Sequence, residues 1–159
     1  MQEVAEALLS AWQTINGQIS ILSRCLIVMA RQDKAVKRLM TAPGVGVLVA
    51  LTYTSVIDDP QRFAKLSSVG AYVGLTPRRL QPGEEDYTGR ISKHGDALLR
   101  TYLFETAGII LHRVAKWSTL KAWGIRLAKR AGAKKATVAV ARKLAGILHR
   151  MWKDGSEFR

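Results

Sequence analysis

The sequence predicts a mainly α-helical protein, in which a long N-terminal coiled-coil helix precedes a compact helical domain. Apolar residues recur at steps of three and four over residues 3–40, and further helical patterns follow, separated by Gly, Pro and polar turns. The 159 residues suffice for one modest domain with its own core. The expected domains are a coiled-coil helix at 1–40, a helical domain at 41–153 and a tail at 154–159. From Lys153 onward we expect frayed chain.

Residues 3–40 are expected to form one helix whose apolar side chains line a single seam. Asp33 occupies the one seam position where an apolar residue is expected. A lone helix cannot bury such a seam, so we expect it to pair with a copy in another chain. The alternative is a helix folded back on its own domain. The seam has heptad spacing and comprises Leu8, Trp12, Ile15, Ile19, Leu22, Leu26, Met29, Val36 and Met40.

The stretch from Thr41 to Gly46 (TAPGVG) ends that helix. Pro43 disfavours helical geometry in the residue before it, and Gly44 and Gly46 permit a tight turn. A second apolar helix is expected over 47–57. Helix, PGVG, helix is the pattern of a helix-hairpin-helix, in which the backbone N–H groups that open the second helix bind a phosphate. The alternative is a turn between two helices that binds no ligand.

Later in the chain, the pattern predicts a short helical turn at 61–66 and helices at 68–73, 97–112, 117–131 and 134–152. Gly74 and Gly132 end two of them, and Asp96 suits an N-cap.

Between Gly74 and Asp96 we expect a long polar loop that carries a binding site. In extended chain the adjacent Arg78 and Arg79 point to opposite sides, so one can reach a phosphate while the other braces the loop. The acidic run 84–86 fits a solvated turn better than a metal site. Candidate phosphate contacts beyond this turn are Arg90, Lys93 and Arg100.

The net charge of +13 is unevenly distributed. Residues 1–60 carry five basic and five acidic side chains, whereas residues 61–159 carry 20 basic and seven acidic ones. Such a field attracts polyanions, with nucleic acid as the leading candidate partner. The alternative is a basic protein whose charged faces are merely solvated.

A single cysteine fits a reducing compartment, and no apolar run approaches a membrane span, so we expect a cytoplasmic protein without a membrane partner. The spacing of His, Cys and acidic residues predicts no metal site and no cofactor in this chain.

Three motifs follow one another in order: residues 39–79 (LMTAPGVG through TPRR), residues 89–96 (GRISKHGD) and Leu99-Arg100. Together they resemble the C-terminal domain of a group of bacterial insertion-sequence transposases. The resemblance implies an N-terminal RuvC-like domain with a DEDD acidic set that would bind Mg²⁺. A coiled coil joins that domain to a C-terminal domain with a helix-hairpin-helix and a serine nucleophile. It further implies DNA and a structured bridge RNA as partners, homo-oligomers formed through the coiled coil, and a nucleoid-associated protein of the bacterial cytoplasm.

The sequence departs from this pattern in two places. It begins at the coiled coil, so we expect the RuvC-like half to be absent, as in a truncated copy or an isolated domain. The family pattern Q-S-G reads Gln81-Pro82-Gly83 here. Pro82 therefore occupies the position of the nucleophilic serine but has no hydroxyl to attack a phosphate. We expect binding of nucleic-acid backbone through Gly44, Gly46, Arg78, Arg79, Arg90, Lys93 and Arg100, with cleavage lost.

Three hypotheses remain open at this point. A transposase fragment would regain cleavage in Pro82→Ser only when the missing half and a guide RNA are supplied. A stand-alone DNA-binding and dimerisation module, derived from a decayed transposase, would bind and dimerise with Pro82 unchanged. A purely structural helical protein would bind nucleic acid weakly, with little dependence on salt.

Overall fold

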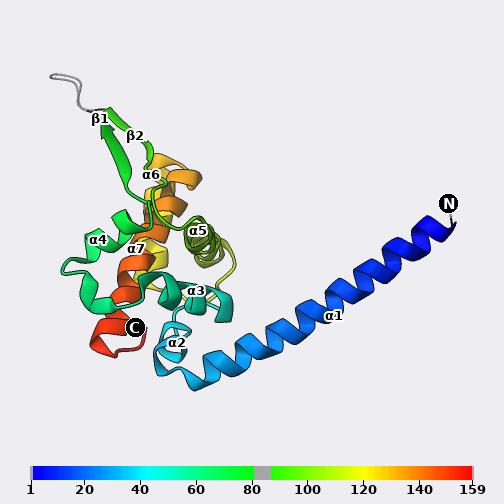
Figure 1. The fold of residues 1–159 in the computed structure, drawn as a ribbon. Helices are drawn as coiled ribbons and strands as arrows, with labels where there is room; N and C mark the ends of the chain where they lie inside the picture. The colour runs from blue at the N-terminus through cyan, green and yellow to red at the C-terminus, as the bar shows by residue number, and fades with distance from the viewer. Residues whose placement is uncertain (1, 81–86, 159) are drawn as a thin grey trace.

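The computed structural model describes residues 2–80 and 87–158, and it is mainly helical, as the sequence predicts (Figure 1). Its elements in chain order are α1 (Gln2–Gln32), α2 (Lys34–Leu39), α3 (Val47–Ile57), the 3₁₀ turn η1 (Pro60–Arg62), α4 (Leu66–Tyr72), β1 (Pro77–Leu80), β2 (Tyr87–Ile91), α5 (Ala97–His112), α6 (Thr119–Ala131) and α7 (Ala133–Asp154).

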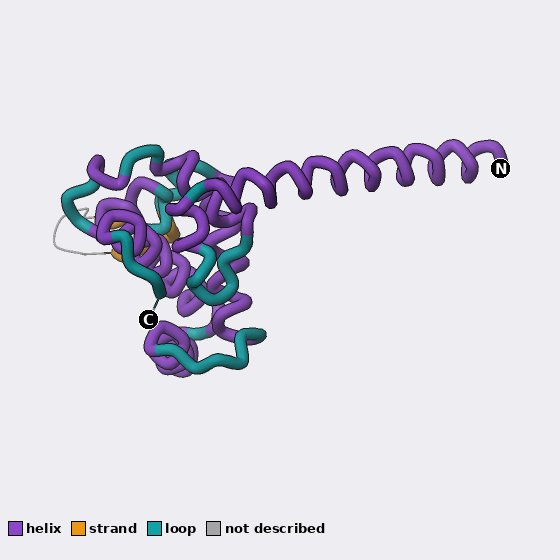
Figure 2. The backbone as a smooth tube through the Cα atoms, turned by 90° about the horizontal axis from the view of Figure 1, so that it is seen from below, coloured by secondary structure: helices purple, strands orange, loops and turns teal. Residues whose placement is uncertain are grey.

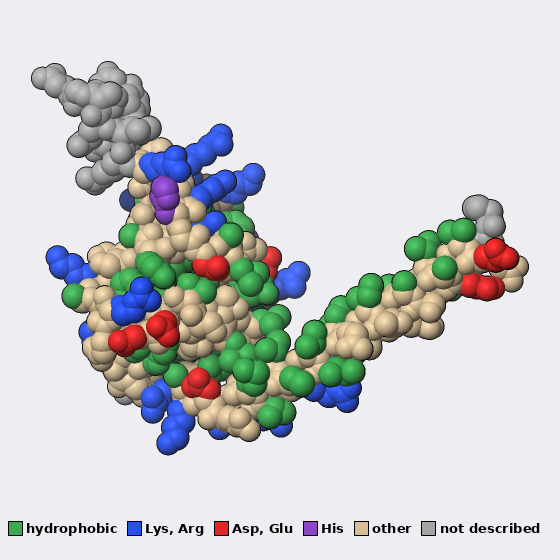
Figure 3. All heavy atoms as spheres, viewed as in Figure 1, with side chains coloured by type: hydrophobic (Ala, Val, Ile, Leu, Met, Phe, Trp, Pro, Cys, Tyr) green, Lys and Arg blue, Asp and Glu red, His purple; other side chains and the backbone are tan. Residues whose placement is uncertain are grey.

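Helix α1 projects from the globular part of the molecule as a single straight arm (Figures 1 and 2). Its apolar side chains line the arm in contact with solvent (Figure 3), and Leu8 and Trp12 are 67% and 65% exposed. The helix does not fold back on its own domain, which excludes that alternative for burying the seam. Pairing with a second chain stays a prediction.

Asp33 breaks the long helix that the heptad pattern predicted to continue to residue 40. Its carboxylate accepts hydrogen bonds from the backbone N–H groups of Ala35 at 2.7 Å and Val36 at 3.1 Å, and so caps the N-terminus of α2. The expectation of one uninterrupted helix was wrong because an Asp side chain competes for these donors and favours a cap over a helix interior. Beyond the break, Val36 and Leu39 are buried in the domain core.

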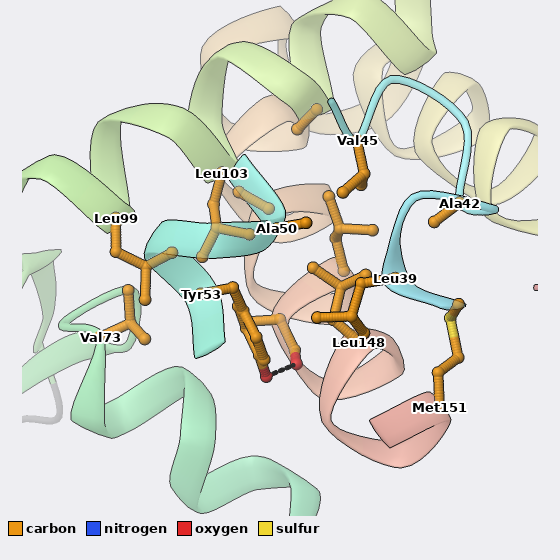
Figure 4. Packing of buried hydrophobic residues seen from close by; sticks show 14 of the residues in the cluster. Leu39, Ala42, Val45, Ala50, Tyr53, Val73, Leu99, Leu103, Leu148 and Met151 are labelled. Carbon is orange, nitrogen blue, oxygen red and sulfur yellow. Dashed lines mark hydrogen bonds between the residues drawn. The ribbon is translucent and has the colours of Figure 1, made fainter. Parts of the chain in front are cut away.

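Helix α7 lies at the centre of the domain and packs against α2, α4, α5 and α6. Its buried face includes Val140, Leu144 and Leu148. The Tyr53 hydroxyl on α3 donates to the carbonyl oxygen of Ala145 at 2.7 Å (Figure 4), and burial raises the pKa of this phenol. The hydroxyl thus stays protonated and ties α3 to α7.

The expected polar loop after Gly74 contains two strands instead. β1 and β2 pair antiparallel, with Leu80 opposite Tyr87 and Pro77 opposite Ile91 and an irregularity in register between Pro77 and Arg79. This two-stranded ribbon stands away from the helices (Figure 1). The loop interpretation was wrong because two short segments, rich in residues that accept extended geometry, satisfy each other's backbone groups.

Two glycines let the chain cross itself at the base of the ribbon. Gly74 and Gly95 have φ angles of +76° and +94°, and a Cβ on either would overlap the backbone of the other segment, at His94 and Tyr72 respectively. The N–H of Lys93 donates to the carbonyl oxygen of Gly74 at 3.1 Å. The position of the ribbon therefore depends on residues without side chains at this crossing.

The remaining helices agree well with the sequence pattern. α3 and α5 have the predicted bounds, Gly132 separates α6 from α7, and Asp96 caps α5. Three differences are that the turn at 61–66 is only η1, that α4 starts two residues earlier than predicted and that α6 starts two residues later. Among the described residues, no helix combines the length and the apolar character needed to cross a bilayer.

The expectation of a frayed chain end was wrong for the residues that the structure describes. α7 continues to Asp154, and the N–H of Phe158 donates to the Thr41 hydroxyl at 3.0 Å. The end of the chain is therefore fastened to the turn between α2 and α3.

We predict that Gly74→Ala lowers the free energy of unfolding on the order of 2–4 kcal/mol, because the new methyl group meets backbone at a left-handed φ. Gly108→Ala is the matched control, since a Cβ at this helical position has nothing within 4 Å. It should stabilise α5 by about 0.5–1 kcal/mol. Urea unfolding followed by circular dichroism measures both, and equal effects would contradict the crossing described above.

Candidate nucleic-acid interface

The turn between α2 and α3 presents the N-terminus of α3 to solvent. Gly44 has a φ of +78°, and its Cα faces α5 so closely that a Cβ would lie 3.3 Å from methyl groups of Thr106 and Ile109. Gly46 is the N-cap of α3 and supplies no side-chain hydrogen bond. The first N–H groups of a helix have no acceptor within the helix, so those of α3 are available to an external anion.

The basic residues of the ribbon fall into two kinds. Arg78 braces the ribbon, because its Nη2 donates to the carbonyl oxygen of Ser92 at 3.0 Å. Arg90 on β2 and Lys93 just after it are exposed. Arg79 lies in β1, and its side chain falls outside the described part of the structure. Pro82 lies between the two strands in the sequence, also outside the described residues.

Arg100, in the first turn of α5, holds the base of the ribbon. Its Nη1 lies 3.2, 3.4 and 3.3 Å from the carbonyl oxygens of Val73, Gly95 and Asp96, respectively. These contacts join the end of α4 to the start of α5, and they give Arg100 a structural task at the crossing of Gly74 and Gly95. A phosphate contact by this side chain remains a prediction.

The structure does not bring the two groups of candidate residues together. Arg100 marks the ribbon side of α5, whereas Thr106 and Ile109 mark the side that meets Gly44. At 3.6 residues per turn, these two positions lie roughly 180–240° around the helix from Arg100. The α3 N-terminus and the ribbon are therefore separate surfaces on opposite sides of α5.

A third basic surface was not among the candidates. Residues 106–153 contain no Asp or Glu but twelve Lys and Arg, and this long acid-free run was visible in the sequence. Basic side chains gather in the upper part of the domain, where the ribbon joins it and α6 lies (Figure 3). The exposed basic residues of these two helices are Arg126, Lys129 and Arg130 on α6, and Lys134, Lys135, Arg142, Lys143, Arg150 and Lys153 along the length of α7.

Residues 36–122 match the family described as the Transposase IS116/IS110/IS902 family. The chain belongs to this family. The match covers more than half of the chain and reaches from α2 into α6. It includes the α2–α3 turn and the ribbon, and it confirms the resemblance at the level of the transposase family.

Curated relatives are identical to this chain at about a third of the aligned positions. It is 33% identical over 124 residues to "Transposase for insertion sequence element IS1111A" of Coxiella burnetii, covering 77% of this chain and 34% of the relative. A "Probable family 20 transposase" of Pseudomonas aeruginosa is 32% identical over 149 residues, covering 93% and 44%. A "Putative transposase y4pF/y4sB" of Sinorhizobium fredii is 32% identical over 150 residues, covering 93% and 39%. The transposase-family chain thus spans less than half the length of these relatives.

The described part of the transposase-family chain offers no cluster of three His, Cys, Asp or Glu side chains that could hold a metal ion. The acidic run 84–86 lies outside that part.

We predict that Arg100→Met in this transposase-family chain costs about 1–3 kcal/mol of stability, because it leaves carbonyl oxygens at the ribbon base without their charged donor. Arg113→Met, at the exposed C-terminal end of the same helix, is the control and should change stability by less than about 0.5 kcal/mol. Amide hydrogen exchange at Val73–Gly95 and thermal unfolding test the difference. Equal effects of the two substitutions would rule out the brace.

Proposed function

We propose that this chain is a nucleic-acid-binding part of a transposase that acts in DNA transposition. The observation that carries the proposal is the membership of the family together with the exposed basic residues of α6 and α7, which lie in a run, 106–153, without Asp or Glu. Such a surface binds phosphate backbone irrespective of sequence. We further propose DNA as the main partner, with a structured guide RNA as a second one.

The turn between α2 and α3 is proposed to act as a helix-hairpin-helix. Three features support this role. The two helices are joined by a short turn with a left-handed glycine, the cap residue Gly46 leaves the approach free of a side chain, and α3 extends over 11 residues. A phosphate oxygen placed at this end of α3 would accept hydrogen bonds from its free N–H groups and meet the positive end of the helix dipole.

The ribbon is proposed as a second contact, with Arg90, Lys93 and Arg79 on phosphates and with Arg78 and Arg100 fixing its position. The contacts of Arg78 with Ser92 and of Arg100 with Val73 support this division of roles. Because the ribbon and the α3 N-terminus lie on opposite sides of α5, they would grip different segments of nucleic acid.

Loss of cleavage is proposed for this chain because Pro82 stands where the family resemblance places a serine nucleophile. A proline supplies no hydroxyl for a covalent link to a DNA phosphate. Chemistry that needs Mg²⁺ would belong to a RuvC-like domain of the whole transposase. The second candidate function, a stand-alone DNA-binding and dimerisation module from a decayed transposase, is favoured by the exposed seam of α1. Both functions would place the protein at the bacterial nucleoid.

The first prediction concerns the α3 N-terminus. Val47→Pro removes one N–H at the first position of α3, where proline is compatible with helix and follows the extended Gly46. We expect duplex DNA affinity to fall on the order of tenfold, the size of one lost hydrogen bond to a charged group. Fluorescence anisotropy across a salt series measures the affinity. A plot of log affinity against log salt concentration should have a slope of about −0.9 for each phosphate that the protein neutralises.

Thr119→Pro, the same change at the first position of α6, is the control and should bind DNA like the unchanged protein. If the unchanged protein binds neither duplex DNA, single-stranded DNA nor folded RNA in a salt-dependent way, the proposed function is wrong. If it binds but both proline variants match it, only the role of the α3 N-terminus fails.

The second prediction concerns α1. We expect self-association through the seam, because Ile15 and Leu22 are 58% and 61% exposed on the part of α1 that projects from the domain. Ile15→Lys/Leu22→Lys should give monomers in sedimentation velocity across a concentration series. Ser10→Lys/Gln13→Lys adds the same charge away from the seam and should leave the oligomers intact. A protein that is monomeric before any substitution would contradict the coiled coil.

A further inference from the structure

We propose that α4, α6 and α7 together form a site for an unpaired stretch of nucleic acid, with Trp123 as the surface on which a base stacks and Arg142 and Lys143 on the flanking phosphates. The inference rests on the proposed nucleic-acid binding and adds a site separate from the α3 N-terminus and from the exposed residues of the ribbon.

Two surface hollows meet at Trp123. The larger, of about 550 Å³, is lined by Ser67 of α4, by Thr76 just before β1, by Trp123 of α6, and by Arg142 and Lys143 of α7. The smaller, of about 290 Å³, is lined by Trp123 with Arg126, Leu127 and Arg130 of α6. One aromatic ring therefore borders two adjoining hollows, and each hollow has two or more cations in its wall.

The ring of Trp123 is half-buried and packs against the core, which fixes its position, and Lys143 holds its Nζ 4.5 Å from the ring centroid. A cation at this distance is attracted to the ring face. Single-strand-binding proteins combine these same two elements, an aromatic side chain for the base and cations for the backbone. Lys143 can release the ring to a base and pair with the adjacent phosphate, since it is exposed.

Arg142 lies beside the hollow because Gly70 of α4, which has no side chain, leaves space for its stem. A Cβ on Gly70 would lie 2.7 Å from Cγ of Arg142, so the arginine stem occupies the space that any other residue at position 70 would take. Among the described residues, the one recorded ion pair joins Arg150 to Asp154 at 3.6 Å. Arg142 and Lys143 therefore have no carboxylate partner in that part of the chain, and their charge is available to a phosphate.

These features favour unpaired nucleic acid over duplex. The bases of a duplex are stacked on their neighbours and cannot offer a face to Trp123, whereas an unpaired base can be turned out and stacked on an aromatic ring. Thr76 places the larger hollow next to the start of β1. A strand held there would run beside the ribbon.

The test is anisotropy of the full 159-residue chain with fluorescent single-stranded DNA, single-stranded RNA and duplex DNA of equal length. Trp123→Leu should weaken single-strand binding about tenfold by loss of one stacked base. Trp123→Phe should retain most of the affinity, and duplex binding should not change. The matched control is Trp117→Leu, because Trp117 is 66% exposed and also has a lysine, Lys121, near its ring at 5.9 Å.

The second part of the test removes charge with Arg142→Gln/Lys143→Gln. The slope of log affinity against log salt for single strands should become shallower by about 1.4, since each phosphate contact contributes about 0.7. Arg24→Gln/Arg31→Gln on α1 removes the same charge elsewhere and should leave the slope unchanged. Equal losses for DNA and RNA mean that the site reads base stacking and phosphate alone, and a larger loss for one of them identifies the natural strand.

Three outcomes overturn the site. The first is that Trp123→Leu and Trp117→Leu bind single strands with the same affinity. The second is that Trp123→Leu weakens duplex binding as much as single-strand binding. The third is that Arg142→Gln/Lys143→Gln keeps the salt slope of the unchanged protein. Circular dichroism checks folding, and if Trp123→Leu unfolds, the Phe and charge variants decide. If the unchanged chain binds in a salt-dependent way and the variants bind equally well, only this site is refuted. Absence of any such binding refutes the proposed function with it.

Discussion

Helix α7 buries one face along most of its length, and every charged side chain that it carries before Asp154 is a cation. The buried face is possible because a small residue lets a neighbouring helix approach: Gly124 of α6 leaves space for Val140. Like charges on α6 and α7 repel one another and oppose this packing. Tyr53 adds a hydrogen bond from α3, and the buried His149 adds one to the Pro60 carbonyl at 2.8 Å. The packing of α7 therefore holds these cations close together against their mutual repulsion.

Local signals predicted most of the helices, because they act within one turn. Asp96 and Gly132 fix helix ends through a cap and a left-handed backbone, and both were read correctly from the sequence. Asp33 was misread, since the heptad pattern gave weight to spacing and none to capping. The pairing of Leu80 with Tyr87 was not predicted either, because a short strand is defined by its partner more than by its own residues.

The candidate site was predicted less well than the fold. The α3 N-terminus was predicted as an exposed helix start, which the structure has, because its glycines signal a turn directly. The sequence predicted that one of Arg78 and Arg79 braces the loop, and Arg78 does so on the carbonyl oxygen of Ser92, 14 positions away. Arg100 looked like a free cation in the sequence, yet its guanidinium group lies on the carbonyl oxygen of Val73, 27 positions away. Trp123 and Lys143 were not linked, since they belong to different helices and meet only through the packing of α6 on α7. Sequence periodicity reports local structure only, so it could not predict these contacts between segments that are distant in the chain.

The length of α1 sets a distance. A helix of 31 residues rises about 46 Å, more than one full turn of B-form DNA at roughly 34 Å. The far end of this arm is therefore held about 46 Å from the point where α1 enters the domain. Asp33 interrupts the helix where it enters the domain, but the last turns of α1 pack against α2 and α3, and Ala30 is buried in the core, so this packing fixes the direction of the arm. The chain therefore carries a rigid spacer whose base is anchored in the domain core.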